Sequence, residues 1–103
     1  NHVGLKVIVE TDALTKEEIG EALECCVKGH ADFIKTSTGY FKSSHNVGAT
    51  PELIQYLVEK ANGRIKVKGS GCVRSRERLI ELIELGIDRA GVGCGSTQKI
   101  LAD

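Results

Sequence analysis

Two lysines each stand where an apolar strand gives way to a loop, a position at which an amine can do chemistry. Lys35 ends the apolar run 33–35 and precedes three hydroxyl residues, 36–38, which Gly39 closes. Lys68 takes the same place at the end of the next predicted strand, 64–68. A buried ammonium costs several kcal/mol unless it is paired or loses its proton. A neutral lysine amine forms a Schiff base with a carbonyl compound, and this is the chemistry that such a pair indicates.

Side-chain alternation decides whether the two lysines meet. Lys66 and Lys68 share one face of their strand, and Phe33 and Lys35 share one face of theirs. Neighbouring parallel strands lie ~4.8 Å apart, so Lys35 and Lys68 come close if both face one cleft. A nearby like charge and partial desolvation lower a lysine pKa. The spacing fits a plainer interpretation equally well, in which Lys66 and Lys68 are solvated charges on an edge strand, and a lone strand-end lysine such as Lys35 is mostly exposed.

Two glycine-rich turns each precede a predicted helix. The first, 69–74, ends in Arg74, and the second is 93–96. Backbone N–H groups at a helix N-terminus bind anions, and a guanidinium adds a matched donor. Glycines also permit tight turns without any ligand. Two such turns in succession, one with an arginine, favour a phosphate site.

Composition excludes several classes of function. The chain has 103 residues, 41% hydrophobic and 27% charged, which suits one soluble domain. Lys+Arg and Asp+Glu both number 14, so a net charge of zero argues against a general grip on nucleic acid or an anionic membrane. No apolar run approaches the ~18 residues of a membrane span. We therefore expect a cytoplasmic protein with neither nucleic acid nor membrane as a partner.

The four cysteines, Cys25, Cys26, Cys72 and Cys94, show no C-x-x-C spacing, and the three histidines are scattered. Adjacent cysteines cannot easily satisfy disulfide geometry with each other. The spacing also argues against a zinc site. We expect reduced thiols that pack in the interior, with no metal and no cofactor.

Strand and helix patterns alternate four times along the chain, which predicts an α/β fold with parallel strands. Apolar stripes at helical spacing are expected to face the sheet. The predicted strands cover 5–10, 32–36, 64–68 and 89–92; helices begin after Thr15, Thr50 and Ser75, and a last helical turn covers 98–102. The expected buried stripes are Ile19, Ala22, Leu23, Cys26 and Val27, then Leu53, Leu57 and Ala61, then Leu79, Ile80, Leu82 and Ile83.

Ligands of such folds collect at the carboxyl ends of the strands. Lys35, Lys68, the turn 93–96 and Glu10 with Thr11 all fall at that end. Four separate segments converge there, which favours a functional site over four unrelated surface features.

Four segments of the chain resemble the deoxyribose-phosphate aldolase family, and the resemblance covers essentially all of it. They are Leu5–Thr11 (LKVIVET), Ala31–Gly39 (ADFIKTSTG), Val67–Arg74 (VKGSGCVR) and Arg89–Gly91 (RAG). The resemblance implies a class I aldolase that reversibly cleaves 2-deoxy-D-ribose 5-phosphate to D-glyceraldehyde 3-phosphate and acetaldehyde without metal. It also implies that the chain is a parallel (β/α)4 half of a TIM (β/α)8 barrel, the C-terminal half.

The same resemblance implies roles for individual residues. Lys35 corresponds to the Schiff-base lysine, and Lys68 to a second lysine that lowers the pKa of the first. Thr38 and Gly39 would line the substrate site. The residues expected around the phosphate are Gly71, Arg74, Gly91, Gly93 and Cys94.

The chain departs from the family pattern at several positions. Cys72 stands where a second glycine is frequent, and Gly69 replaces a common proline or alanine. Gly93 and Cys94 stand where two serines are usual, so two hydroxyls are missing there. The family's aspartate that assists proton transfer belongs to a strand that would precede Leu5; the nearest carboxylate at the rim is Glu10, to which we assign no such role.

Residues 1–103 are expected to form a single (β/α)4 half-barrel domain. Four βα units leave two open sheet edges, which are aggregation liabilities. The chain is therefore expected either to pair with a second copy as a homo-oligomer that approaches eight strands, or to be part of a longer aldolase. Two alternative functions stay open: a half-barrel that binds sugar phosphates without turnover, and a class I aldolase for another sugar phosphate.

Overall fold

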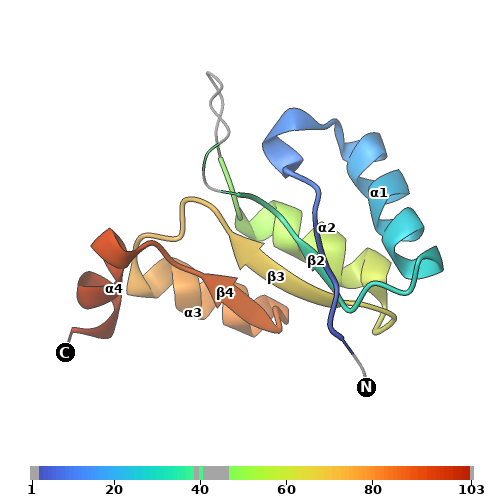
Figure 1. Ribbon diagram of the computed structural model, residues 1–103. Coiled ribbons are helices and arrows are strands. Elements are labelled where there is room, and N and C mark those ends of the chain that lie inside the picture. Colours follow the sequence, from blue (N-terminus) through green and yellow to red (C-terminus); the bar gives the residue numbers. More distant parts are fainter. Residues whose placement is uncertain (1–2, 39, 41–46, 103) are drawn as a thin grey trace.

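The computed structural model describes residues 3–38, 40 and 47–102, and its strands form one parallel sheet in the order β1-β2-β3-β4. Helices alternate with the strands along the chain (Figure 1). The elements are β1 (Lys6–Ile8), the 3-10 turn η1 (Thr11–Ala13), α1 (Lys16–Lys28), β2 (Phe33–Lys35), α2 (Pro51–Ala61), β3 (Lys66–Ser70), α3 (Arg76–Leu85), β4 (Arg89–Gly91) and α4 (Cys94–Leu101). The predicted α/β class and parallel order are confirmed.

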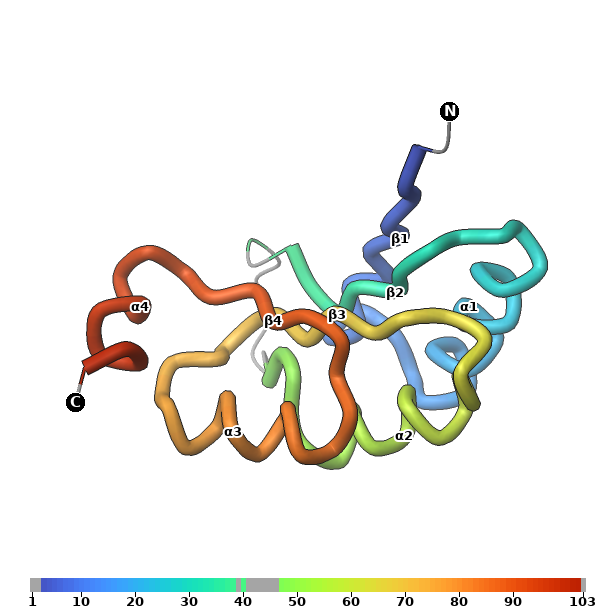
Figure 2. The backbone as a smooth tube through the Cα atoms, turned by 90° about the horizontal axis from the view of Figure 1, so that it is seen from below, coloured from blue at the N-terminus to red at the C-terminus, as the bar shows by residue number. Residues whose placement is uncertain are grey.

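The sheet is covered on one face only. Helices α1, α2 and α3 lie side by side beneath the strands, and α4 follows β4 at the end of the sheet beside α3 (Figure 2). In the described part of the chain no helix covers the opposite face, which we call the open face. Side chains that alternate along the strands therefore divide between an apolar core and the open face.

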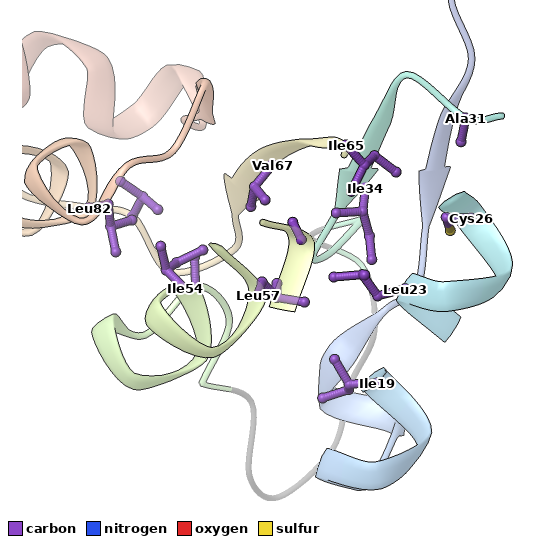
Figure 3. Packing of buried hydrophobic residues seen from close by; sticks show 13 residues of the cluster. Ile19, Leu23, Cys26, Ala31, Ile34, Ile54, Leu57, Ile65, Val67 and Leu82 are labelled. Atoms are coloured by element: carbon purple, nitrogen blue, oxygen red, sulfur yellow. The ribbon is translucent and has the colours of Figure 1, made fainter. Parts of the chain in front are cut away.

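The core lies between the sheet and its helices. Ile34 and Val67 are register partners on β2 and β3, and both are buried. They pack in one cluster with Leu23 of α1, Leu57 of α2 and Leu82 of α3 (Figure 3). The predicted alternation on β2 and β3 is thus confirmed, with the aliphatic side chains toward the helices.

Local capping signals fix where the helices begin. Thr15 and Glu18 form the predicted capping box, in which the Thr15 amide donates to Glu18 Oε1 at 2.8 Å and the Glu18 amide to Thr15 Oγ1 at 3.2 Å. Thr50 and Ser75 accept hydrogen bonds from the third residue of α2 and α3. Gly86 ends α3 in the left-handed conformation.

Several element boundaries differ from the prediction, and the end of β3 and the start of α4 are the two that change the site. Gly69 and Ser70 extend β3 because they pair with Ala90 and Gly91 of β4. The last helix begins at Cys94, with Gly93 as its N-cap, rather than at Gln98. Glycine has a low helix propensity, so Gly95 made the first turn of α4 look like a loop in the sequence.

Two groups of apolar residues are more exposed than predicted. Ile80 and Ile83 of α3 are 47% and 56% exposed, because α3 ends the helical layer and turns only Leu82 fully inward. None of the four cysteines forms a disulfide, and only Cys26 is buried; Cys25 and Cys94 are exposed and Cys72 is intermediate. The expectation of packing cysteines is therefore wrong for Cys25 and Cys94.

Leu57→Ala should lower the free energy of unfolding by about 3 kcal/mol, because it leaves a cavity in the fully buried centre of the core. Urea denaturation followed by circular dichroism measures the change. Ile83→Ala is the matched control, since it removes a half-exposed aliphatic side chain and should change stability by no more than about 0.5 kcal/mol. Equal losses in the two variants would contradict this packing.

Candidate functional site

Lys35 and Lys68 lie side by side on the open face. They are register partners across β2 and β3, and Lys68 in turn pairs with Arg89 on β4. This is the adjacency that their matching positions in the sequence predicted. Because β3 lies between β2 and β4, the alternative that Lys66 and Lys68 belong to an edge strand is wrong.

The environment of Lys68 favours its neutral amine. Partial burial lowers the pKa of Lys68 below its usual 10.5, and the positive charges of Lys35, Lys6 and Arg89 lower it further. Lys68 therefore loses its proton at a lower pH than a solvated lysine does.

Two hydroxyl side chains hold the lysine-bearing strands together just beyond the lysines. Thr36 is fully buried; its Oγ1 donates to the Ser70 carbonyl at 2.5 Å and accepts from the Ser70 amide at 2.9 Å. The Ser70 hydroxyl donates to the Ser37 carbonyl at 2.8 Å. Side chains thus continue the connection between β2 and β3 after the regular pairing ends at Lys35, which fixes the direction in which the strands leave the sheet.

Two carboxylates after β1 anchor both ends of segment 39–46, of which only Tyr40 is among the described residues. Glu10 accepts from the Thr38 amide at 3.1 Å and from the Thr38 hydroxyl at 2.5 Å. Asp12 accepts from the amides of Val47 and Gly48 at 3.1 and 3.0 Å. We call this pair the Glu10–Asp12 clamp, and it fixes the backbone that follows Lys35.

The charge of Glu10 is maintained by its partners. Burial works to raise the pKa of Glu10, but the hydrogen bonds from the Thr38 side chain and backbone, the Ser37 hydroxyl and the charge of Lys35 together hold it below its usual 4.5. Glu10 is therefore an anion that binds the loop at neutral pH.

The turn after β3 is tightly packed against its neighbours. Gly71 has a φ of +90°, and a Cβ there would lie 3.0 Å from the Ser37 side chain. A Cβ on Gly48 would lie 2.2 Å from the Gly71 carbonyl oxygen, while the Ala49 amide donates to that same oxygen at 2.9 Å. The positive φ and the close neighbours therefore favour glycine at both positions without any ligand, which is compatible with the plainer interpretation of the turn.

A cavity of about 410 Å³ opens at the carboxyl ends of β2, β3 and β4. Six of the residues predicted for the site line it: Lys35, Thr38, Gly71, Arg74, Gly91 and Gly93. Its other lining residues are Ser37, Tyr40, Ser70, Cys72, Val73, Val92 and Ser96. The cavity lies between the N-termini of α3 and α4, each of which presents backbone N–H groups.

Three predicted residues are not part of that lining. Lys68 lies next to it, since a Cβ added to Gly91 would be 3.5 Å from Lys68 Cε. Cys94 is exposed at the first position of α4 and does not line the cavity. Gly39 lies outside the described residues.

The sequence analysis placed Ser70 and Ser96 in the two glycine-rich turns but gave their hydroxyls no role; both residues line the cavity. Ser70 was taken for a turn residue although it belongs to β3. Ser96 lies in the first turn of α4, which begins earlier than predicted. Ser96 supplies a hydroxyl in the region where Gly93 and Cys94 replace the two serines usual in the family.

The described residues lack two further kinds of feature. No three His, Cys, Asp or Glu side chains within 3–38, 40 and 47–102 lie close enough to hold a metal ion. In the same residues no helix is both long and apolar enough to cross a membrane.

Comparison with known proteins adds sequence relatives to this geometry. No family model matches the chain. The chain is 49% identical over 90 residues to a deoxyribose-phosphate aldolase of Aquifex aeolicus, an alignment that covers 87% of the chain and 39% of that protein. A deoxyribose-phosphate aldolase of Thermus thermophilus is 41% identical over 91 residues, with 88% and 40% covered. This chain is homologous to the deoxyribose-phosphate aldolases.

Solved structures of aldolases share the fold. The aldolase QR15 is 50% identical with a TM-score of 0.76, covering 84% of this chain and 37% of that one. The deoxyribose phosphate aldolase of Aeropyrum pernix, described as a tetramer, gives a TM-score of 0.79 at 27% identity and covers 96% and 40%. The chain spans about two fifths of the length of the curated relatives it matches. Its fold is accordingly that of half of an aldolase (β/α)8 barrel.

Glu10→Gln should speed amide hydrogen exchange at Thr38 by roughly tenfold, because a neutral amide replaces a carboxylate that accepts two hydrogen bonds. In the unchanged protein the pKa of Glu10 is lowered by folding. The contribution of the Glu10 carboxylate to stability is therefore complete above the usual pKa of 4.5 and is lost as the pH falls through the folded-state pKa. Exchange at Thr38 in the variant should lack this acid dependence. Glu21→Gln, on the exposed side of α1, is the control; an equal effect there would contradict the clamp.

Proposed function

We propose that this chain carries the Schiff-base machinery of a class I aldolase that reversibly cleaves 2-deoxy-D-ribose 5-phosphate to D-glyceraldehyde 3-phosphate and acetaldehyde. The observation that carries the proposal is the register pair of Lys35 and Lys68 at the mouth of a cavity between two helix N-termini. Homology to the deoxyribose-phosphate aldolases supports the choice of substrate.

In this proposal Lys35 is the nucleophile. Its neutral Nζ adds to the C1 aldehyde of the open-chain sugar, and loss of water gives a protonated imine. Removal of the proton from the C3 hydroxyl then makes C3 a carbonyl as the C2–C3 bond breaks, and the electron pair passes into the enamine at C1–C2. D-Glyceraldehyde 3-phosphate leaves, C2 takes up a proton, and water releases acetaldehyde and the free amine of Lys35.

Lys68 assists this step. Partial burial, and then the positive charges beside it, lower the pKa of Lys68, so its neutral amine is available to accept the proton that the Lys35 nitrogen loses after it has added to the aldehyde.

The opposite side of the cavity suits the phosphate. Arg74 lines it, as do the backbone of Gly71 and Gly93, and Ser96 adds a hydroxyl within the first turn of α4. The helix N-termini direct partial positive charge toward an anion placed between them. A phosphate held there orients the sugar with its C1 toward β2, where Lys35 lies.

Borohydride reduction in the presence of acetaldehyde should add one ethyl group at Lys35 faster than at exposed lysines, because only Lys35 is proposed to form the imine at an activated amine. Peptide mass mapping locates the label, and 2-deoxy-D-ribose 5-phosphate should compete with it. Lys35→Arg should abolish the fast labelling, whereas Lys28→Arg on the exposed end of α1 should leave it unchanged.

Fast labelling at another lysine, or no label in the protein that contains the remaining barrel, would contradict the role of Lys35. Stabilisation by 2-deoxy-D-ribose 5-phosphate without release of acetaldehyde would select the non-catalytic sugar-phosphate-binding function. Faster turnover of a different sugar phosphate would select the alternative of a class I aldolase for another sugar phosphate.

The rate of imine formation should rise with pH as Lys68 loses its proton, and the neighbours of Lys68 should set the position of that rise. Arg89 is one of the charges that lower the pKa of Lys68, so Arg89→Gln should move the rising limb to higher pH. Arg78→Gln on α3 is the control and should leave the limb in place. A shift to lower pH in Arg89→Gln would contradict the electrostatic role of this residue.

A further inference from the structure

Asp12 is the member of the Glu10–Asp12 clamp whose contacts lead away from Lys35. Its two carboxylate oxygens accept hydrogen bonds from two consecutive amides, that of Val47 at 3.1 Å and that of Gly48 at 3.0 Å. Glu10 binds Thr38, just after Lys35, whereas Asp12 binds the backbone that leads into α2. The proposed aldolase chemistry gives Asp12 no role.

The turn that carries Asp12 is itself fixed against the sheet. Thr11 is 5% exposed, and its amide donates to the Thr36 carbonyl just after β2 at 2.8 Å. The Leu14 amide donates to the Thr11 carbonyl at 3.1 Å, which closes η1. Asp12 therefore binds Val47 and Gly48 from a turn that is held in place on both sides.

The backbone that Asp12 binds lies directly against the turn 71–74, which follows β3. A Cβ on Gly48 would lie 2.2 Å from the Gly71 carbonyl oxygen, and a Cβ on Gly71 would lie 3.2 Å from the Gly48 Cα. The amide of Ala49 donates to the same Gly71 carbonyl at 2.9 Å, and Ala49 is fully buried. A short path of backbone contacts thus joins the Asp12 carboxylate to Gly71.

The turn 71–74 needs contacts from outside because its own conformation is unfavourable. Gly71 and Cys72 both have a positive φ, +90° and +60°. Cys72 is not a glycine, so the left-handed conformation costs it free energy, and it persists only where the surroundings hold it. Gly48 and Ala49 supply such contacts at Gly71.

The same turn forms one wall of the cavity. Gly71 and Arg74 line the cavity, and the turn leads into Ser75, the N-cap of α3. In the proposed function this wall binds the phosphate. A displaced turn would carry its backbone N–H groups and Arg74 away from the phosphate, while Lys35 and Lys68 would stay in the regular pairing of β2 with β3.

We propose that Asp12 is a positioning residue for the phosphate group of the substrate. Its carboxylate holds Val47 and Gly48 in the conformation in which Gly48 and Ala49 fix the turn 71–74. The inference rests on the proposed function, because it concerns the phosphate end of the same cavity. Asp12 does not line the cavity, so its loss weakens the binding of phosphate and leaves the reaction at the Lys35 amine unchanged.

Asp12→Asn tests this role, because asparagine keeps the size of the side chain but replaces one accepting oxygen by an NH2 group. The protein that contains this chain and the remaining barrel is assayed for release of acetaldehyde. The KM for 2-deoxy-D-ribose 5-phosphate should rise about fivefold, since a hydrogen bond to a charged group is lost at a distance from the ligand. The kcat should stay within about twofold, and kcat/KM for unphosphorylated 2-deoxy-D-ribose should not change.

Gly48→Ala perturbs the same path at its centre. Its Cβ must displace the Gly71 carbonyl, so the KM for the sugar phosphate should rise at least as much as in Asp12→Asn. The double variant should show little beyond the larger single effect, because both changes act through one contact. Exchange of the Ala49 amide with solvent should also be faster in Asp12→Asn.

Asp88→Asn is the matched control, because the Asp88 carboxylate also accepts from a backbone amide, that of Val67 at 2.9 Å, but lies outside the cavity lining. It should leave the KM for the sugar phosphate unchanged; a rise equal to that of Asp12→Asn would overturn the proposal. So would an equal loss of kcat/KM for the phosphorylated and unphosphorylated sugars, or an unchanged rate of exchange at Ala49.

Borohydride trapping of acetaldehyde at Lys35 separates this inference from the proposed function. Trapping in Asp12→Asn together with an unchanged KM would overturn the positioning role alone. Absence of trapping in the unchanged protein would overturn the aldolase assignment and this inference with it. If Asp12→Asn does not fold by circular dichroism, Asp12→Glu, whose carboxylate lies at a longer reach, is judged by the same criteria.

Discussion

The alignment of β2 with β3 is the constraint on which the rest of this structure depends. It places Lys35 directly beside Lys68 on the open face and Ile34 directly beside Val67 in the core. A shift of one residue would exchange the faces and bury two ammonium groups among aliphatic side chains. The reciprocal hydrogen bonds of Thr36 and Ser70 secure the alignment just past the lysines, so core packing and chemistry are decided by the same contact.

On the open face, the clustered positive charges lower the stability of the fold but favour amine chemistry. Like charges side by side oppose folding, yet partial burial together with these charges lowers the pKa of Lys68, which suits the proposed role of its neutral amine as a base. The helical layer supplies the stability that tolerates this repulsion, through a core of leucine, isoleucine and valine that contacts only the other face. At the amino ends of the strands, the ring of Phe33 stabilises three further cations, Lys6, Lys66 and Arg89, through cation–π contacts.

Features governed by near neighbours could be predicted from the sequence, and those governed by distant contacts could not. The capping box at Thr15 and the alternation of Lys35 with Ile34 depend on a few adjacent residues. The exposure of Ile80 and Ile83 depends on which helix lies beside α3, which periodicity does not encode. Ser70 belongs to β3 because it is hydrogen-bonded to Thr36 and paired with Gly91 of β4, although both of its sequence neighbours are glycines. Matching strand-end positions singled out the two lysines and the resemblance to the aldolases gave them roles, whereas the clamp formed by Glu10 and Asp12 became visible only in three dimensions.

The Glu10–Asp12 clamp separates the segment it encloses from the residues that flank it. Four backbone and side-chain donors at Thr38, Val47 and Gly48 are held by two carboxylates two residues apart, on a turn that belongs to another βα unit. The composition and length of residues 39–46 can therefore diverge between related proteins while Lys35 and the start of α2 keep their positions. Because Tyr40 of this segment lines the cavity, substitution there can alter what the cavity accepts while Lys35 stays in place.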